Sequence, residues 1–248
     1  MLPPDLRSAE SEALAGLCSA LAADPRGRWT VELRFEGLRL LPVVLRLTEA
    51  LEEAGVGLRL LFADAGAAAL ARRDGPGLAL RIASFSDQLR LQKASAEPGA
   101  SAADATSAEV ALEPASAPVL LLVGAAQAEY DEVEELCRVH PGAVVLINPG
   151  LEDAAVGIGS VARQRRRGFL SQLQAAYALL PLPGAALRRL HPGDWELYRL
   201  DADGYRLLGG FDHRPDGEER EALLSGGEGA GLGSTLRSVD RLIEGLQR

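Results

Sequence analysis

Two continuous apolar runs, separated by an amphipathic stretch, constrain the fold of this chain most strongly. Residues 119–126 read VLLLVGAA and residues 142–149 read GAVVLINP, and residues 129–139 between them have the spacing of an amphipathic helix. Strands that are apolar on both faces are typical of parallel sheets covered by helices on both sides. The sequence therefore predicts an α/β fold with a mainly parallel central sheet and helices on both faces.

The N-terminal part follows the same alternation. Apolar residues at helical spacing predict helices, and continuous or alternating apolar residues predict strands between them. Asp5 precedes the first helical pattern and Gly55 ends the second, and both residue types are common at those helix ends. The predicted helices cover 5–23, 40–55 and 64–74, and the predicted strands cover 28–35, 56–63 and 78–84.

The C-terminal half changes character. Residues 185–211 contain three consecutive strand-like segments, and DADG at 201–204 is typical of a hairpin turn between the last two. We therefore expect antiparallel strands to extend the parallel sheet. Residues 161–180 fit a helix and a strand equally well.

Composition divides the chain into further parts. Residues 1–225 are predicted to form a single α/β domain. Within it, residues 92–118 are rich in alanine, serine, proline and acids, without periodicity, which predicts a disordered insertion. Glycine-rich residues 226–233 predict a flexible linker. Residues 234–248 predict an amphipathic helix, and the sequence leaves open whether it docks on its own domain or on a partner.

The totals exclude several classes of function. The chain has 248 residues and a formal charge of −9, which argues against a nucleic-acid partner. Lys93 is the only lysine, which disfavours Walker-type phosphate binding and Schiff-base chemistry. No apolar run approaches the roughly 18–20 residues that span a bilayer. We expect no transmembrane segment, and a cytoplasmic or at most peripheral membrane protein.

Two polar residues and a glycine lie at or near the ends of three predicted parallel strands. Asp64, Gly124 and Asn148 should meet at the carboxyl edge of the sheet, where α/β proteins bind ligands, and Asp153 follows nearby. Each polar residue has a structural alternative, since Asp64 can cap a helix and Asn148, the only asparagine, can start an Asn-Pro turn. The spacing of these acids does not favour a metal site, and we predict none.

An arginine run follows a glycine-spaced stretch. Gly157, Gly159 and Ala162 match G-x-G-x-x-A but lack the adjoining strand and the later acid of a dinucleotide site. Three alternatives stay open for the arginines: an anion cradle, a solvated helix start, or a contact to an acidic protein. The arginines are Arg163, Arg165, Arg166 and Arg167.

Templates for catalysis are missing from the sequence. It has no G-x-S-x-G elbow, no H-E-x-x-H and no Cys-x-x-Cys. We therefore assign no catalytic residue and no cofactor, and a non-enzymatic role is favoured.

Several segments in order resemble one family. They are LFADAGAAALARRD at 61–74, VVLINPGLED at 144–153, YALLPL at 177–182 and LRRLHPGDWELY at 187–198, which contains Trp195. Together they resemble the domain-of-unknown-function family of cyanobacteria and plastids, whose plant members include the low photosystem II accumulation type of assembly factor. The resemblance implies a photosynthetic organism and a role in building thylakoid complexes.

These observations lead to two hypotheses. The first is a non-enzymatic accessory factor that binds a protein partner, such as a subunit of a thylakoid membrane complex, through a surface that includes Arg163–Arg167 and the predicted helix 234–248. Trp195 is a further candidate for ligand or partner binding. The second is an α/β domain, with or without enzymatic activity, that binds a nucleotide or another phosphorylated ligand at the carboxyl edge of the sheet. Its pocket would lie around Asp64, Gly124, Asn148 and Arg163.

Overall fold

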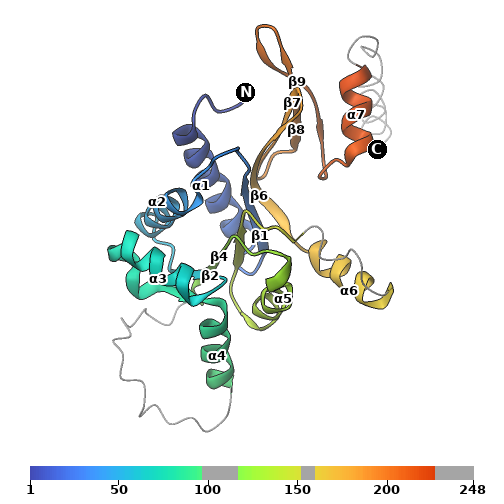
Figure 1. Ribbon diagram of the computed structural model, residues 1–248. Helices are drawn as coiled ribbons and strands as arrows, with labels where there is room; N and C mark the ends of the chain where they lie inside the picture. Colours follow the sequence, from blue (N-terminus) through green and yellow to red (C-terminus); the bar gives the residue numbers. More distant parts are fainter. Residues whose placement is uncertain (97–116, 152–159, 227–248) are drawn as a thin grey trace, which may run out of the picture. The chain divides into compact units, whose positions relative to one another are not determined.

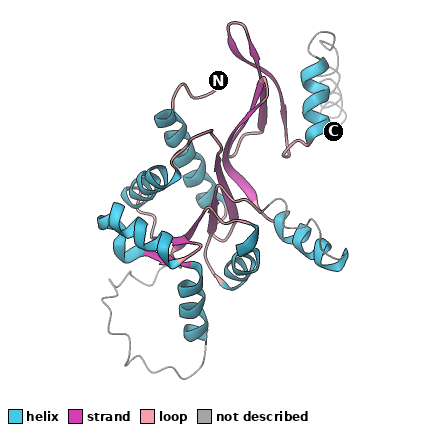
Figure 2. Cartoon of the chain, viewed as in Figure 1, coloured by secondary structure: helices cyan, strands magenta, loops and turns pink. Residues whose placement is uncertain are grey.

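The computed structural model describes residues 1–96, 117–151 and 160–226, which form a mixed α/β fold (Figures 1 and 2). The α-helices are α1 Leu6–Ala23, α2 Leu40–Glu53, α3 Ala65–Asp74, α4 Phe85–Ala96, α5 Tyr130–Val139, α6 Ser160–Leu170 and α7 Gly217–Ser225. The strands are β1 Arg28–Leu33, β2 Leu58–Phe62, β3 Ile82–Ser84, β4 Val119–Val123, β5 Val144–Ile147, β6 Gln174–Leu182, β7 Ala185–Leu190, β8 Trp195–Asp201 and β9 Gly204–Phe211.

The hydrogen-bonded strand order is β3-β2-β4-β5-β1-β6-β7-β8-β9. Strands β1 to β6 pair in parallel, and β8 and β9 pair antiparallel. The first strand of the chain lies between two late ones, with Trp29 opposite Val145 of β5 and Val31 opposite Tyr177 of β6. The predicted fold class, a mainly parallel sheet extended by antiparallel strands, is confirmed.

The chain forms two compact units. The parallel unit contains Pro3–Leu180 together with Arg189–Gly193. The hairpin unit contains Met1–Leu2, Pro181–Arg188 and the described residues from Asp194 onward. Each is described by itself below.

Helices cover both faces of the parallel unit (Figure 1). Helices α1 and α2 pack together and against the strands, and Leu17 and Leu51 are fully buried there. On the other face, α4, α5 and α6 bury Phe85, Val133 and Phe169 against alternate residues of the strands. Burying each such side chain stabilises the fold by about 1.5–3 kcal/mol, so the apolar runs of the sequence are the main source of stability.

Arg28 joins the start of β1 to the end of α5. Its guanidinium donates hydrogen bonds to the carbonyl oxygens of Cys137 (3.0 Å from Nε), His140 (3.0 Å) and Gly142 (2.8 Å). It also donates to the nearby carbonyl oxygens of Arg26 (2.6 Å) and Gly27 (3.3 Å). A cation at this position satisfies the last carbonyls of the helix and complements its dipole. The contact spans 109 residues of sequence between Arg28 and Cys137.

Three segments differ from the sequence predictions or were not predicted. Residues Pro76–Arg81 form a 3-10 helix, so β3 keeps only the last three residues of the predicted strand 78–84. Proline and glycine at 76 and 77 favour a turn there, and Leu80 is 79% exposed. Helix α4 was not predicted, and it makes residues 92–96 helical where the insertion 92–118 was expected to be disordered.

The remaining predictions have mixed outcomes. The open segment 161–180 contains the end of α6 and the start of β6, and α7 was not predicted. Asp201 pairs with Gly204 at the tip of the β8–β9 hairpin, as the DADG turn predicted. Residues 97–116 of the predicted insertion, the linker from residue 227 and the predicted helix 234–248 lie outside the described residues.

Candidate functional site

The carboxyl edge of the parallel unit is the site that the sequence singled out. Strands β2 and β4 are neighbours, but the chain leaves them in opposite directions, toward β3 and toward β5. Such a divergence opens the usual ligand crevice of α/β sheets. Asp64 follows β2, Gly124 follows β4, and Asn148 follows the adjacent β5. The structure therefore brings the three predicted residues to neighbouring strand ends.

Asp64 acts as the N-cap of α3. Its Oδ1 accepts a hydrogen bond from the backbone N–H of Ala67 at 2.8 Å, and its backbone is extended. This is the structural alternative that the sequence left open, and it satisfies one of the unpaired donors at the helix start. One carboxylate oxygen of Asp64 is thereby committed to the helix.

Gly124 turns the chain out of β4. Its φ of +61° lies in the left-handed region, which side chains with a Cβ rarely adopt. Its N–H donates to the carbonyl oxygen of Ile147 at 2.9 Å, and continues the ladder between β4 and β5. A Cβ at this position would meet only Leu40, at 4.0 Å. Conformation, and not crowding, therefore explains the glycine.

Asn148 locks β5 to β1. Its φ of +48° is left-handed, a conformation that asparagine tolerates better than most residues. Its Oδ1 accepts from the N–H of Leu33 at 2.6 Å, and its Nδ2 donates to the carbonyl oxygen of Leu33 at 2.7 Å. The side chain thus continues the parallel ladder past the end of the strand. Both ends of the amide point at backbone rather than at an open site.

Helix α6 is anchored to α5 by an aromatic contact. Phe169 is 6% exposed, and its ring meets that of Tyr130 edge-on, with centroids 5.6 Å apart. The guanidinium of Arg166 lies 4.4 Å from the Tyr130 ring centroid and 3.7 Å from Asp131. A cation over an aromatic face is attracted by the ring quadrupole. Arg166 therefore faces its own domain.

The other arginines of α6 differ among themselves. Arg165 forms a two-point ion pair with Glu134 of α5, at 2.6 and 3.3 Å. Arg163 and Arg167 are exposed and four residues apart, so they lie on one side of the helix. Arg165 and Arg166 thus contact α5, although the Arg165 side chain is itself 73% exposed, and we call Arg163 and Arg167 the outer arginines.

Tyr130 is the residue of this region that the sequence did not single out. It is 1% exposed, and burial raises the pKa of its hydroxyl to about 12, with Glu134 adding to the rise. Its hydroxyl has no hydrogen-bond partner within the described residues. The only signal was a tyrosine at the start of the predicted helix 129–139, which does not distinguish a core residue from a functional one.

Trp195 and Asp153 are the remaining predicted site residues. Trp195 belongs to the hairpin unit, is 5% exposed and lies under the guanidinium of Arg214, 5.5 Å from a ring centroid. It therefore packs inside its unit. Asp153, like Gly157 and Gly159, lies outside the described residues.

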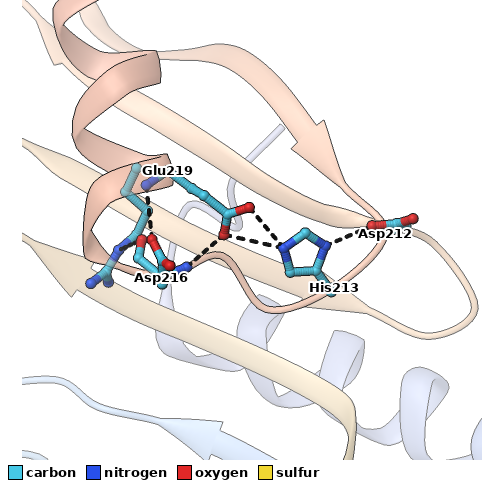
Figure 3. Close-up of polar contacts among 5 residues, drawn as sticks. Asp212, His213, Asp216 and Glu219 are labelled. Atoms are coloured by element: carbon cyan, nitrogen blue, oxygen red, sulfur yellow. Dashed lines mark hydrogen bonds and ion pairs between the residues drawn. The ribbon is translucent and has the colours of Figure 1, made fainter.

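The hairpin unit carries an exposed histidine between two carboxylates (Figure 3). His213 Nδ1 lies 2.7 Å from Asp212 Oδ1, and Nε2 lies 3.0 Å from Glu219 Oε1. These hydrogen bonds, to Asp212 first and then to Glu219, raise the pKa of His213. Glu219 also accepts from the N–H of Asp216, which caps α7 in return. The histidine therefore ties the end of β9 to the start of α7.

Across 1–96, 117–151 and 160–226, no three histidine, cysteine or acidic side chains are placed to hold a metal ion. Among these residues, no helix is long and apolar enough to cross a membrane.

Comparison with known families gives one result. Residues 3–222 match the domain of unknown function DUF1995, so the chain belongs to this family. The match covers both units and confirms the domain-of-unknown-function membership that the motifs predicted. A search of the curated proteins finds no match.

Proposed function

We propose that this protein is a non-enzymatic accessory factor that binds an acidic surface of a protein partner during the biogenesis of photosystem II or another thylakoid complex. The outer arginines of α6, Arg163 and Arg167, form the centre of the binding surface. The thylakoid setting rests on the resemblance of the sequence motifs to the assembly-factor family.

The observation that carries this proposal is that one side of α6 is anchored to α5 while another side exposes arginines. Phe169 and Arg166 fix one side of the helix to Tyr130, while Arg163 and Arg167 are exposed on another. A fixed helix presents its charges with little loss of conformational entropy on binding. On a chain of charge −9, such a basic side favours one acidic protein surface over polyanions in general.

The carboxyl edge offers less to a small ligand. Asp64 caps α3, and both amide atoms of Asn148 bind the backbone of Leu33. A ligand at this edge would compete with these contacts for the same polar atoms. The phosphorylated-ligand hypothesis at this edge therefore has less support than the protein-partner hypothesis.

The test is affinity capture from detergent-solubilised photosynthetic membranes with purified bait. The variant carries Arg163→Glu and Arg167→Glu, which leaves the contacts of Arg165 and Arg166 in place. The control carries Arg7→Glu and Arg26→Glu, two exposed arginines elsewhere on the parallel unit with the same change in charge. The recovery of membrane-complex subunits by the wild type, the α6 variant and the control is compared at low and moderate salt.

We expect wild type and control to recover subunits of one membrane complex, and the α6 variant to lose them. Because exposed charges act mainly on association rate and are screened by salt, recovery should also fall as salt rises. Equal recovery by all three baits would place the interface elsewhere. Recovery of no complex subunit by wild type would refute the proposed role.

A further inference from the structure

A pocket lies at the opposite end of the parallel unit from the carboxyl edge. It has a volume of about 680 Å³ and is lined by residues of α4 and α5 and by residues at the starts of β2, β4 and β5. The apolar part of the lining includes Leu91, Pro118 and Val139. A volume of roughly 300–1,000 Å³ is typical of small-molecule sites. We call it the α4–α5 pocket.

Positive charge dominates the lining of the α4–α5 pocket. It contains Arg59, Lys93 and Arg138 against a single carboxylate, Glu135. Glu135 forms an ion pair with Arg138 at 2.7 Å, so Arg59 and Lys93 supply the excess charge. The hydrogen bond of Arg59 is to a neutral group, the Oε1 of Gln88, at 3.1 Å. Within the described residues, Arg59 has no carboxylate at ion-pair distance.

A hydrogen-bond chain fixes the polar wall of the pocket. His140 Nε2 lies 2.8 Å from the carbonyl oxygen of Pro118, which can only accept, so this nitrogen carries the proton. His140 Nδ1 must then accept, and Gln92 Nε2 donates to it at 3.0 Å. The orientation of the Gln92 amide follows from these roles. Its Oε1 is left as a hydrogen-bond acceptor.

That acceptor is unused. Gln92 Oε1 is buried and has no hydrogen-bond partner in the part of the chain that the structure describes. Leaving a buried acceptor unpaired costs about 1–3 kcal/mol. Because this oxygen is covered in the described conformation, a ligand hydroxyl can donate to it only when the Gln92 side chain turns toward the pocket, and that hydrogen bond would remove the penalty. The pocket thus combines an excess of cations with one acceptor that needs a donor.

We propose that the α4–α5 pocket binds a small phosphate monoester that carries hydroxyl groups. The phosphate oxygens accept hydrogen bonds from the N–H groups of Arg59 and from the ammonium of Lys93, and a ligand hydroxyl donates to Gln92 Oε1. A phosphate monoester carries a charge of about −1.5 to −2 at neutral pH, which matches the excess of positive groups. The guanidinium fork suits phosphate oxygens in two-point geometry. This site does not include α6 and stands apart from the proposed protein interface.

The test measures binding by calorimetry to the full-length protein with four probes. Glucose 6-phosphate has both the phosphate and the hydroxyls, glucose has only the hydroxyls, inorganic phosphate has only the anion, and malate replaces phosphate by carboxylates. We expect saturable binding of glucose 6-phosphate and at least about tenfold weaker binding of the other three, since each lacks one charge-assisted or donor contact.

Two variants and a control locate the site. Lys93→Met changes an exposed residue and leaves the core intact, and Arg59→Met removes the guanidinium. Arg90→Met is the control, because Arg90 is exposed on α4, pairs with Asp87 and does not line the pocket. We expect Lys93→Met to weaken glucose 6-phosphate binding several-fold, Arg59→Met about tenfold or more, and Arg90→Met not at all.

Three results would overturn the proposal. One is the absence of saturable glucose 6-phosphate binding to wild type. Another is equal affinity of wild type and Lys93→Met, which does not depend on whether Arg59→Met folds. The third is binding of malate as tight as that of glucose 6-phosphate, which would exchange the phosphate for a carboxylate ligand.

A second readout is the titration of His140 followed by NMR. Burial, together with the charges of Arg28 and Arg59, lowers the pKa of His140. An anion bound at Arg59 offsets one of these charges, so the pKa of His140 should rise when glucose 6-phosphate saturates the pocket. An unchanged His140 titration in a saturated sample would place the ligand outside the α4–α5 pocket.

Discussion

The two ends of the parallel strands use their polar groups in different ways. At the carboxyl edge, the caps and turns consume them, as Asp64 binds Ala67 and Asn148 binds Leu33 through both amide atoms. At the other end, the α4–α5 pocket leaves the buried acceptor of Gln92 unpaired and Arg59 bound only to a neutral amide. Asp64 and Asn148 at the usual ligand edge are therefore structural here, and the cationic groups of the pocket lie at the opposite end.

The comparison also shows why residue type alone misleads. An asparagine or an aspartate close to a glycine is typical of binding loops, but the same residues also cap helices and hold left-handed turns. Only the atoms that remain without partners distinguish the two uses. The following predictions test the contrast between structural polar groups at the carboxyl edge and ligand-binding groups in the α4–α5 pocket, and each has an outcome that would contradict it.

Asn148→Ala should produce the largest loss. The variant loses both hydrogen bonds to Leu33. Alanine must still adopt a φ of +48°, but it has no side-chain amide whose hydrogen bonds offset the strain. The free energy of unfolding should therefore fall by about 2–4 kcal/mol. Urea denaturation measures it. Asn148→Gly keeps the backbone conformation and should lose less. If Asn148→Ala lowers the free energy of unfolding by less than about 0.5 kcal/mol, the two hydrogen bonds between Asn148 and Leu33 do not stabilise the fold.

Asp64→Ala should lower the free energy of unfolding by about 1 kcal/mol, the usual value of an N-cap. Asp64→Ser keeps a side-chain oxygen that can accept from the N–H of Ala67, so it should retain most of the stability that Asp64→Ala loses. Urea denaturation of both variants checks this. If serine fails to restore stability and the loss with alanine disappears in the presence of a phosphate ligand, Asp64 belongs to a binding site and the contrast is wrong.

His140 and His213 should give smaller effects, with opposite dependence on pH. The pKa of His140 is lowered by burial, so its stabilising contribution is complete above the unfolded value of about 6.5 and is lost as pH falls through the folded pKa. The pKa of His213 is raised, so its contribution is complete below about 6.5 and is lost as pH rises through the folded pKa.

Unfolding profiles over pH about 5 to about 8 would measure both effects, because histidine titrates in this range. In a plot of the free energy of unfolding against pH, His140→Gln should reduce the slope at acid pH. His213→Gln should reduce the slope near neutral pH. A His140→Gln profile parallel to wild type would show that the ring is not held neutral between Gln92 and Pro118, and the proposed pocket would lose its free acceptor.

Tyr130→Phe should produce the smallest effect, within about 0.5 kcal/mol of wild type, because its hydroxyl has no partner within the described residues. The contacts of the ring with Arg166 and Phe169 persist in the variant. Urea denaturation measures the change. A loss above about 1 kcal/mol would mean that the hydroxyl has a polar partner, and the carboxyl edge would then hold an occupied site.

Much of the fold could be predicted because apolar runs dominate it. The runs at 119–126 and 142–149 contain β4 and β5, and they are buried on both faces as parallel strands must be. The helix α4 escaped prediction, although Ser84 and Asp87 form the Ser-x-x-Asp start signal, with Ser84 Oγ accepting from the N–H of Asp87 at 3.1 Å. The alanine-rich sequence after it obscured the helical pattern.

The candidate site was less predictable than the fold. Position at a strand end could be inferred for Asp64 and Asn148, because it depends on local sequence alone. The α4–α5 pocket depends on Arg59, Gln92 and His140, which only the strand order brings together. None of these residues belongs to a motif, so no pattern of types at a spacing could have indicated them.

The place of β1 between β5 and β6 has a consequence for synthesis. The ribosome makes β1 early, but the asparagine that locks it, Asn148, comes 115 residues after Leu33. At roughly 5–20 residues per second, β1 waits on the order of ten seconds with both edges unpaired. The nascent chain therefore carries an apolar strand, with Val31 and Leu33, that nothing made so far can complete. A circular permutant that places β1 after β5 would shorten this exposure and should aggregate less during expression.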